Sequence, residues 1–198
     1  MAAGAIIAGA AAAAHREAIN SADAAWGPYA KARKLRHVPG TPDAQDPTDP
    51  RVDGEFDDVS IAFKLAPISG DWGVTAVAVP KTPMKLNVAV SHEGLLAKIG
   101  KIFGAKDLIL GDAEFDPKYL VRVSDDAEGH RLLDAKTRVE MLNLGVRTLT
   151  YQDGTIDEQS PIVMVGIPRV LTSTDELDRM LRLLATLAKM TPEPKPYR

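Results

Sequence analysis

Short stretches of alternating apolar and polar residues, joined by short turns, constrain the fold of this chain more than any other feature. Residues 59–65 read VSIAFKL, with an apolar side chain at every second position, and similar alternation recurs at 74–79, 86–90 and 119–123. Two further apolar arms, 146–151 and 162–165, flank the turn-forming pair Asp153-Gly154. Because successive side chains of a strand point to opposite faces, these patterns are typical of half-buried strands. The short connections favour antiparallel pairing.

Apolar residues at helical spacing predict helices between and after these strands. One helical face is formed by Leu95, Leu96, Ile99, Ile102 and Phe103, with Ser91 as a candidate N-cap and Gly104 as a stop. A short helix at Leu132-Leu133 and a longer one ending at Gly145 follow. The last helix has a capping box at Ser173 and Glu176 and the stripe Leu177, Met180, Leu181, Leu184 and Leu187. We therefore predict an α+β fold, with mainly antiparallel sheet packed against helices and an Ala-rich helix at the N-terminus.

The N-terminal segment has an unusual composition. Residues 2–14 read AAGAIIAGAAAAA, without a polar side chain. As a helix they would span about 20 Å, which is less than the ~30 Å hydrocarbon core of a bilayer. No Lys or Arg precedes them, and this disfavours a secretory signal peptide. The first interpretation is the start of an ordinary helix, and the alternatives are a membrane-inserted anchor or a signal peptide.

An apolar stripe continues this helix. Ile19, Ala22, Trp26 and Tyr29 recur at spacings of three to four residues, and Pro28 predicts a kink or a second helix that begins there. The stripe either packs on the chain's own domain or projects and buries itself in a second chain or, as a less favoured partner, a membrane surface. We expect the second outcome, with Ile19, Trp26 and Tyr29 as the partner contact, because large aromatic side chains dominate contact energetics.

A basic run and an acidic loop follow the stripe. Lys31, Arg33, Lys34 and Arg36 are candidates for contact with an anionic membrane surface, and the alternative is a helix C-terminus stabilised by its dipole. The next stretch is rich in Pro and Asp. We expect four parts in the chain: an N-terminal helical segment (1–38), a linker (39–54), an α+β domain (55–190) and a flexible tail (191–198).

Composition excludes several kinds of site. The chain has no Cys, which excludes disulfides, thiolate metal sites and a cysteine nucleophile. Its net charge is −3 and its aromatic fraction is 5%, so neither the basic surface nor the stacking platforms of a nucleic-acid-binding protein are expected. Gly100-Lys101 with Gly104 lacks the full phosphate-loop pattern. We expect no cofactor and no nucleic acid partner.

The densest group of acids lies near the middle of the chain and comprises Asp112, Glu114, Asp116, Asp125 and Asp126, with His130 four residues further on. Carboxylates with a histidine are ligands for Mg²⁺, Mn²⁺ or Zn²⁺, although the spacing matches no established metal motif. The alternative is that they serve turns and helix caps. Ser91 and His92 lie beside each other, but no nucleophile-elbow motif supports a Ser–His–Asp triad.

A set of short motifs spread over residues 25–188 can be compared with known families: Ala25-Trp26, Leu35, Gly54, Trp72, Gly94-Leu95, Gly104, Gly111-Asp112, Phe115-Asp116, Tyr119-Leu120-Val121, Ser124-Asp125-Asp126, Leu132-Leu133, Asp153-Gly154 and Asp175-Glu176-Leu177. In these residues the chain resembles a loosely defined family of uncharacterised bacterial proteins, several of them membrane-anchored. The resemblance implies a shared fold and no assigned activity. Physically, Phe115 and Tyr119 are expected to pack together, and Leu132-Leu133 to enter the core.

These observations lead to two hypotheses of function. The first is a non-enzymatic binding or scaffolding domain that contacts another protein or a second copy of itself through a sheet face or helix groove. A membrane surface is a further candidate partner, and the expected location is the cytoplasm, either free or at the inner membrane as a peripheral or anchored protein. The alternative is a metal-dependent hydrolase with its site around Asp112–His130. Convergence of Asp112, Asp116, Asp125 and His130 in one pocket would favour the hydrolase.

Overall fold

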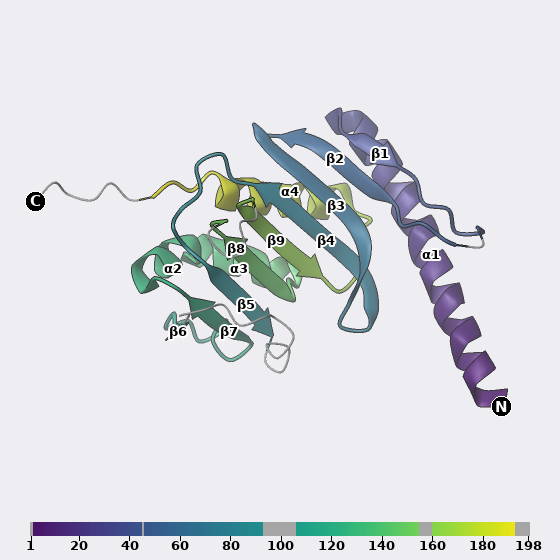
Figure 1. Cartoon of the computed structure of the whole chain (residues 1–198), viewed down its shortest axis with the longest axis horizontal. Helices are drawn as coiled ribbons and strands as arrows, with labels where there is room; N and C mark the ends of the chain where they lie inside the picture. The colour runs from purple at the N-terminus through teal and green to yellow at the C-terminus, as the bar shows by residue number, and fades with distance from the viewer. Residues whose placement is uncertain (1, 45, 93–105, 155–159, 193–198) are drawn as a thin grey trace, which may run out of the picture.

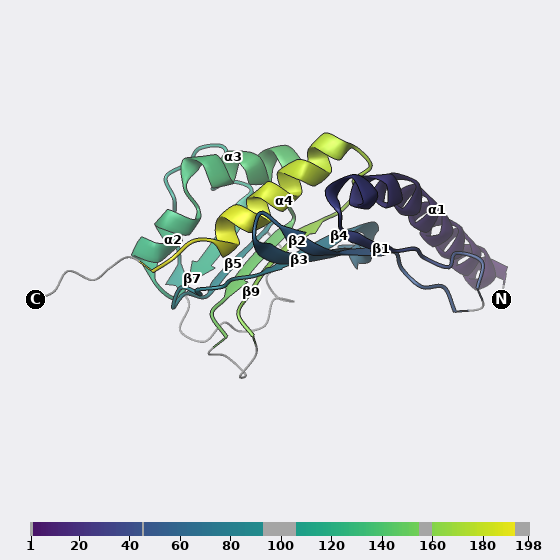
Figure 2. The ribbon, with the colours of Figure 1, turned by 90° about the horizontal axis from the view of Figure 1, so that it is seen from above.

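The computed structural model describes residues 2–44, 46–92, 106–154 and 160–192, with side chains described from Ala10 onward. Within these ranges one sheet of nine strands forms the first layer, and four helices lie on one of its faces as the second layer (Figures 1 and 2). All strand pairings are antiparallel. The predicted α+β class, with helices packed on an antiparallel sheet and an Ala-rich helix at the N-terminus, is confirmed.

The strands follow the order β1-β2-β3-β4-β9-β8-β5-β7-β6 across the sheet. Their bounds are β1 Arg36–Val38, β2 Arg51–Phe56, β3 Val59–Ile68, β4 Asp71–Val79, β5 Val88–His92, β6 Lys106–Asp107, β7 Tyr119–Val123, β8 Thr148–Gln152 and β9 Ile162–Ile167. Asp57 and Asp58 join β2 to β3 with φ angles of 51° and 58°, as in the two-residue hairpin turns that match strand twist. This turn sets Val52 opposite Phe63, which keeps both side chains on the helix-covered face.

The helices are α1 Ala2–Arg33, α2 Asp126–Leu132, α3 Ala135–Leu144 and α4 Thr174–Ala188. Asp125 caps α2, since its side chain accepts a hydrogen bond from the Glu128 backbone N–H. Gly145 ends α3 in a left-handed conformation, with a φ of 66°, and this conformation carries little strain for glycine.

The capping box predicted for α4 is not formed among the described contacts. Ser173 occupies the N-cap position but makes no side-chain hydrogen bond there. Glu176 instead accepts a hydrogen bond of 2.6 Å from Arg169 Nη2. The helix still begins where predicted, because Leu177, Leu181 and Leu184 are fully buried against the sheet.

The helix α1 is continuous through Pro28, which corrects the expectation of a kink or a second helix there. Trp26 and Tyr29 on either side of Pro28 are buried in the core. Packing against one surface therefore holds both parts of the helix on a common axis despite the missing hydrogen bond. The N-terminal turns of α1 run past the edge of the sheet (Figures 1 and 2), and the side chains of residues 10–14 are exposed.

The expected linker has more structure than its composition indicates. Residues 51–54 belong to β2, so the strand begins inside the range 39–54. Thr41 and Thr48 close the acidic loop through a backbone hydrogen bond of 3.0 Å. The same loop is tied to α1, because Asp49 lies 2.7 Å from His15 Nε2 and Asp43 pairs with Arg16. Ser91, the candidate N-cap of the next predicted helix, belongs together with His92 to β5 instead. The rest of that predicted helix and most of the expected tail lie outside the described residues.

Candidate binding groove between α3 and α4

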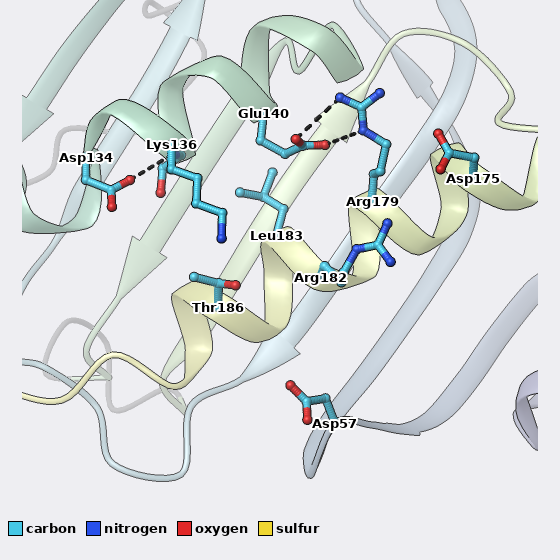
Figure 3. Close-up of a pocket in the computed structure, with 10 residues that line it drawn as sticks. Asp57, Asp134, Lys136, Glu140, Asp175, Arg179, Arg182, Leu183 and Thr186 are labelled. Carbon is cyan, nitrogen blue, oxygen red and sulfur yellow. Dashed lines mark hydrogen bonds and ion pairs between the residues drawn. The ribbon is translucent and has the colours of Figure 1, made fainter.

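A polar groove of about 580 Å³ lies over the outer surface of α4, between α3 and the turn that joins β2 to β3 (Figure 3). Its wall on the α3 side carries Asp134, Lys136, Thr137 and Glu140, α4 contributes Asp175, Arg179, Arg182, Leu183 and Thr186, and Asp57 projects from the turn. The groove is therefore formed by side chains from three separate parts of the sequence. Its lining is mostly charged, with Leu183 as the only large apolar residue among the ten.

The positions of these side chains follow from how the two helices are built. Asp134 caps α3, because its Oδ1 accepts a hydrogen bond of 2.7 Å from the Thr137 backbone N–H. The stripe of buried leucines holds α4 on the sheet, so the opposite stripe, which contains Asp175, Arg182 and Thr186, faces solvent. The polar faces of two neighbouring helices thus border one surface depression.

One ion pair links the two helices across the groove. Arg179 Nε lies 2.6 Å from Glu140 Oε1, and Arg179 Nη2 lies 3.3 Å from Glu140 Oε2. Each side chain is less than a third exposed, and this two-point geometry is the strong form of a carboxylate–guanidinium contact. The hydrogen bond that Arg179 donates to the Glu140 carboxylate raises the pKa of the Arg179 guanidinium. The pair fixes the spacing of α3 and α4 at the end of the groove where Glu140 lies.

Two cations of the groove, Lys136 and Arg182, form no ion pair within the described ranges, although the charge of Arg182 helps to lower the pKa of the Asp178 carboxyl. Nine of the arginines in the described ranges form ion pairs with a carboxylate, and Arg147 and Arg182 are the two that do not. Lys136 is exposed and likewise forms no ion pair within those ranges. Figure 3 shows its side chain extending from α3 toward α4. The groove therefore presents Lys136 and Arg182 as binding groups that the fold itself does not use.

The acids of the groove, in contrast, are compensated. Asp134 is the N-cap of α3 and Asp175 lies in the first turn of α4, where backbone N–H groups and the helix dipole stabilise negative charge. Glu140 pairs with Arg179 and Asp57 pairs with Lys189. The uncompensated charge in the groove is positive.

The stripe predicted to contact a partner lies in the chain's own core. Ile19 and Trp26 are fully buried, and Tyr29 is 4% exposed. Trp26 Nε1 donates a hydrogen bond of 2.8 Å to the Leu171 carbonyl, and the Tyr29 hydroxyl donates one of 2.8 Å to Asp178. The stripe therefore packs on the chain's own domain and does not form the expected partner contact. The polar ends of both aromatic side chains also have partners there, one after β9 and one on α4.

The basic run after the stripe divides into two pairs. Arg33 forms an ion pair with Asp178, and Arg36 contacts both carboxylate oxygens of Asp53. Lys31 and Lys34 are exposed and form no ion pair in the described parts of the chain. Of the four residues of the basic run, Lys31 and Lys34 therefore remain free to contact an anionic surface.

The acids around Asp112 serve local structure. Asp112 pairs with Arg138 at 2.7 Å and accepts backbone hydrogen bonds from Glu114 and Phe115. The Arg138 contact is the main cause of the lowered pKa of the Asp112 carboxyl. Asp116 accepts hydrogen bonds from the Leu110 and Asp112 backbone N–H groups. His130 is exposed on α2. No group of three or more His, Asp or Glu side chains that could hold a metal ion occurs among the described residues.

The predicted packing of the same region is present. The rings of Phe115 and Tyr119 stack with centroids 4.4 Å apart, and Leu132 and Leu133 are fully buried.

Ser91 and His92 are adjacent on β5, so their side chains point to opposite faces of the sheet. They cannot act together in a triad.

Sequence reasoning missed the groove altogether. Its cations lie on the exposed faces of two predicted helices, where charged residues are ordinary. The available signal was the polar stripe at Asp175, Arg179, Arg182 and Thr186, which has the spacing of one helical face. That spacing identifies a solvent face and does not show that α3 borders it.

Comparisons with known proteins support the fold and leave the activity open. No protein-family model matches the chain, and no curated protein matches it in sequence. A solved structure, that of the mycobacterial trehalose monomycolate transport factor A, TtfA, is similar, with a TM-score of 0.52 and 14% sequence identity. The match covers 81% of this chain and 88% of that one. At this identity the likeness shows a common fold, and the resemblance to a family of uncharacterised bacterial proteins stays a prediction.

Among the described residues, no helix combines the length and the apolar character that crossing a bilayer needs.

Proposed function

We propose that this protein is a non-enzymatic binding module, and that its α3–α4 groove holds an acidic segment of another protein. The observation that carries the proposal is the presence of Lys136 and Arg182, which form no ion pair among the described residues, in an open groove whose acids are all compensated. A carboxylate from a partner would pair with either cation without displacing an existing contact.

The chemistry of the lining favours binding over catalysis. The ten lining residues include no histidine and no serine, and their two hydroxyl groups belong to Thr137 and Thr186. A general base within hydrogen-bond reach of a nucleophile is the usual requirement for covalent catalysis. Small-molecule sites are also mostly apolar and enclose their ligand, whereas this groove is open and charged (Figure 3). A peptide segment that lies along α4 fits these properties better.

The location that we propose is the cytoplasmic face of the inner membrane, with peripheral attachment. Its support is the pair of exposed lysines, Lys31 and Lys34, near the end of α1, together with the exposed alanines of its N-terminal turns. Each lysine near an anionic surface contributes about 1 kcal/mol, so the attachment would be weak and sensitive to salt. Co-sedimentation with phosphatidylglycerol vesicles, lost in the variant Lys31→Glu/Lys34→Glu, is the expected result, and equal sedimentation of both forms would contradict it.

Affinity purification of the full chain from its source organism after chemical crosslinking tests the groove. The wild type is compared with Lys136→Glu/Arg182→Glu, in which both cations are reversed. The matched control, Lys81→Glu/Lys85→Glu, reverses two exposed lysines on the connection between β4 and β5. We expect a partner protein with an acidic segment to be recovered with the wild type and the control and to be lost with the groove variant. Recovery with all three would contradict a role for the groove.

A further inference from the structure

Three basic side chains meet at one end of the sheet, outside the α3–α4 groove. His92 is the last residue of β5, Lys118 precedes β7, and Arg147 precedes β8. The register places His92 opposite Tyr119 of β7, and the His92 backbone N–H donates a hydrogen bond of 3.2 Å to the Arg147 carbonyl. The pairing of the three strands thus brings the three cations together although they are far apart in sequence.

Arg147 is the more unusual of the two arginines without an ion pair. Its Nε atom is buried and has no hydrogen-bond partner, whereas Arg182 is exposed to solvent. A buried N–H group of a charged side chain without an acceptor is costly, because it has lost its water and gained nothing in exchange. Arg147 as a whole is only half-buried, so an acceptor from outside the chain can approach the guanidinium from its exposed side.

The surroundings of His92 support this reading. Its ring contacts the Tyr119 ring edge-on, with centroids 4.6 Å apart. Burial and the positive charges of Arg147 and Lys118 lower the pKa of its imidazole, and no carboxylate contributes. The Tyr119 hydroxyl cannot supply the missing charge, since it donates a hydrogen bond of 2.7 Å to the Val146 carbonyl. The cluster is therefore positive and uncompensated.

From these contacts we infer that His92, Lys118 and Arg147 form a binding site for an oxyanion, such as a phosphate group. The planar guanidinium of Arg147 matches two oxygens of a phosphate, and Lys118 adds a point charge at the exposed side. An anion there would pair with the exposed side of the Arg147 guanidinium and offset the positive charges of Arg147 and Lys118. The phosphate is either a free ion or the headgroup of an anionic lipid.

The test uses the full chain and two forms of phosphate. Thermal unfolding is followed in sodium phosphate and in sodium chloride of equal ionic strength, and binding to phosphatidylglycerol vesicles is measured separately. We expect phosphate to raise the melting temperature of the wild type above its value in chloride, by mass action. The vesicle measurement distinguishes the sources, because binding that requires Arg147 assigns a lipid headgroup and a shift in phosphate alone assigns the free ion.

Variants separate a specific site from a general effect of salt. Arg147→Met is expected to weaken phosphate binding by about tenfold or more, and Lys118→Gln, at an exposed position, to weaken it less. Lys81→Gln is the matched control, since it removes an exposed cation outside both sites and should leave the shift unchanged. If Arg147→Met does not fold, Arg147→Lys keeps the positive charge and Lys118→Gln still tests the site.

The ring of His92 gives a second measurement. Bound phosphate favours the protonated imidazole, so the pKa of His92 measured by nuclear magnetic resonance should rise when phosphate is added. A purely structural cluster would show no such change. Equal melting temperatures in phosphate and chloride, together with vesicle binding that is the same for the wild type and Arg147→Met and an unchanged His92 pKa, would overturn the inference.

Discussion

Replacing Trp26 tests whether α1 is an integral part of the folded domain. The side chain is fully buried, its ring meets Phe63 edge-on with centroids 5.0 Å apart, and its Nε1–H bonds the Leu171 carbonyl. The variant Trp26→Ala loses all three contributions, and the expected cost is about 3–5 kcal/mol of unfolding free energy. The variant Trp26→Phe keeps most of the ring packing and leaves the buried carbonyl without its donor, for a cost of about 1–3 kcal/mol.

Urea unfolding followed by far-ultraviolet circular dichroism measures both values. A domain of this kind has a stability of about 5–15 kcal/mol, so each variant should remain folded in water and unfold at a lower urea concentration. The dependence on urea should keep its slope, because the exposed area on unfolding changes little. The control is Val139→Ala, whose side chain is 53% exposed and whose effect should stay within about 0.5 kcal/mol. A cost for Trp26→Ala as small as that of the control would refute the docking of α1 on the sheet.

Three further predictions concern α4, an ion pair and metal binding. The variant Leu181→Ala, at a fully buried position, should cost about 2–5 kcal/mol in the same urea experiment, and an unchanged midpoint would show that the apolar face of α4 was assigned wrongly. The hydrogen bond from Arg33 is the main cause of the lowered pKa of the Asp178 carboxyl. The stabilisation that the ionised carboxylate gives the fold is therefore present above the ordinary carboxyl pKa and lost as the pH falls through the lowered value. The variant Asp178→Asn should be less stable at neutral pH and should lose less stability in acid. Chelator should leave the melting temperature unchanged, and a shift with Mn²⁺ or Zn²⁺ that disappears in Asp116→Ala would contradict the assignment of this acid to a turn.

The strands and the last helix could be predicted because local pattern and tertiary environment agree. Residues 59–65 alternate, and the structure buries every second side chain of β3. In α4 the leucines at three- and four-residue spacing are all buried. Burial of one face of a strand or helix is enough to produce its apolar pattern, whichever element packs on that face. The pattern can therefore be recognised without knowing the tertiary neighbour.

The docking of α1 and the groove could not be predicted, because both depend on contacts between distant residues. The stripe around Trp26 shows that one helical face is covered but not by what, and its hydrogen bond joins residues 145 positions apart. Arg33 and Asp178 are separated by the same distance in sequence. Which cations remain unpaired, Lys136 and Arg182 among them, depends on such pairings, so the groove is visible only in the folded chain.

Site-specific photo-crosslinking in the source organism tests the central claim most directly, namely that the α3–α4 groove binds another protein. A photoreactive amino acid replaces Thr186, which is exposed in the groove, and a second form carries it at Ser60, exposed on the opposite face of the sheet. The account predicts a crosslinked partner from position 186 that disappears when Lys136→Glu and Arg182→Glu are added, and none from position 60. A partner captured from position 60 and not from position 186 would contradict it.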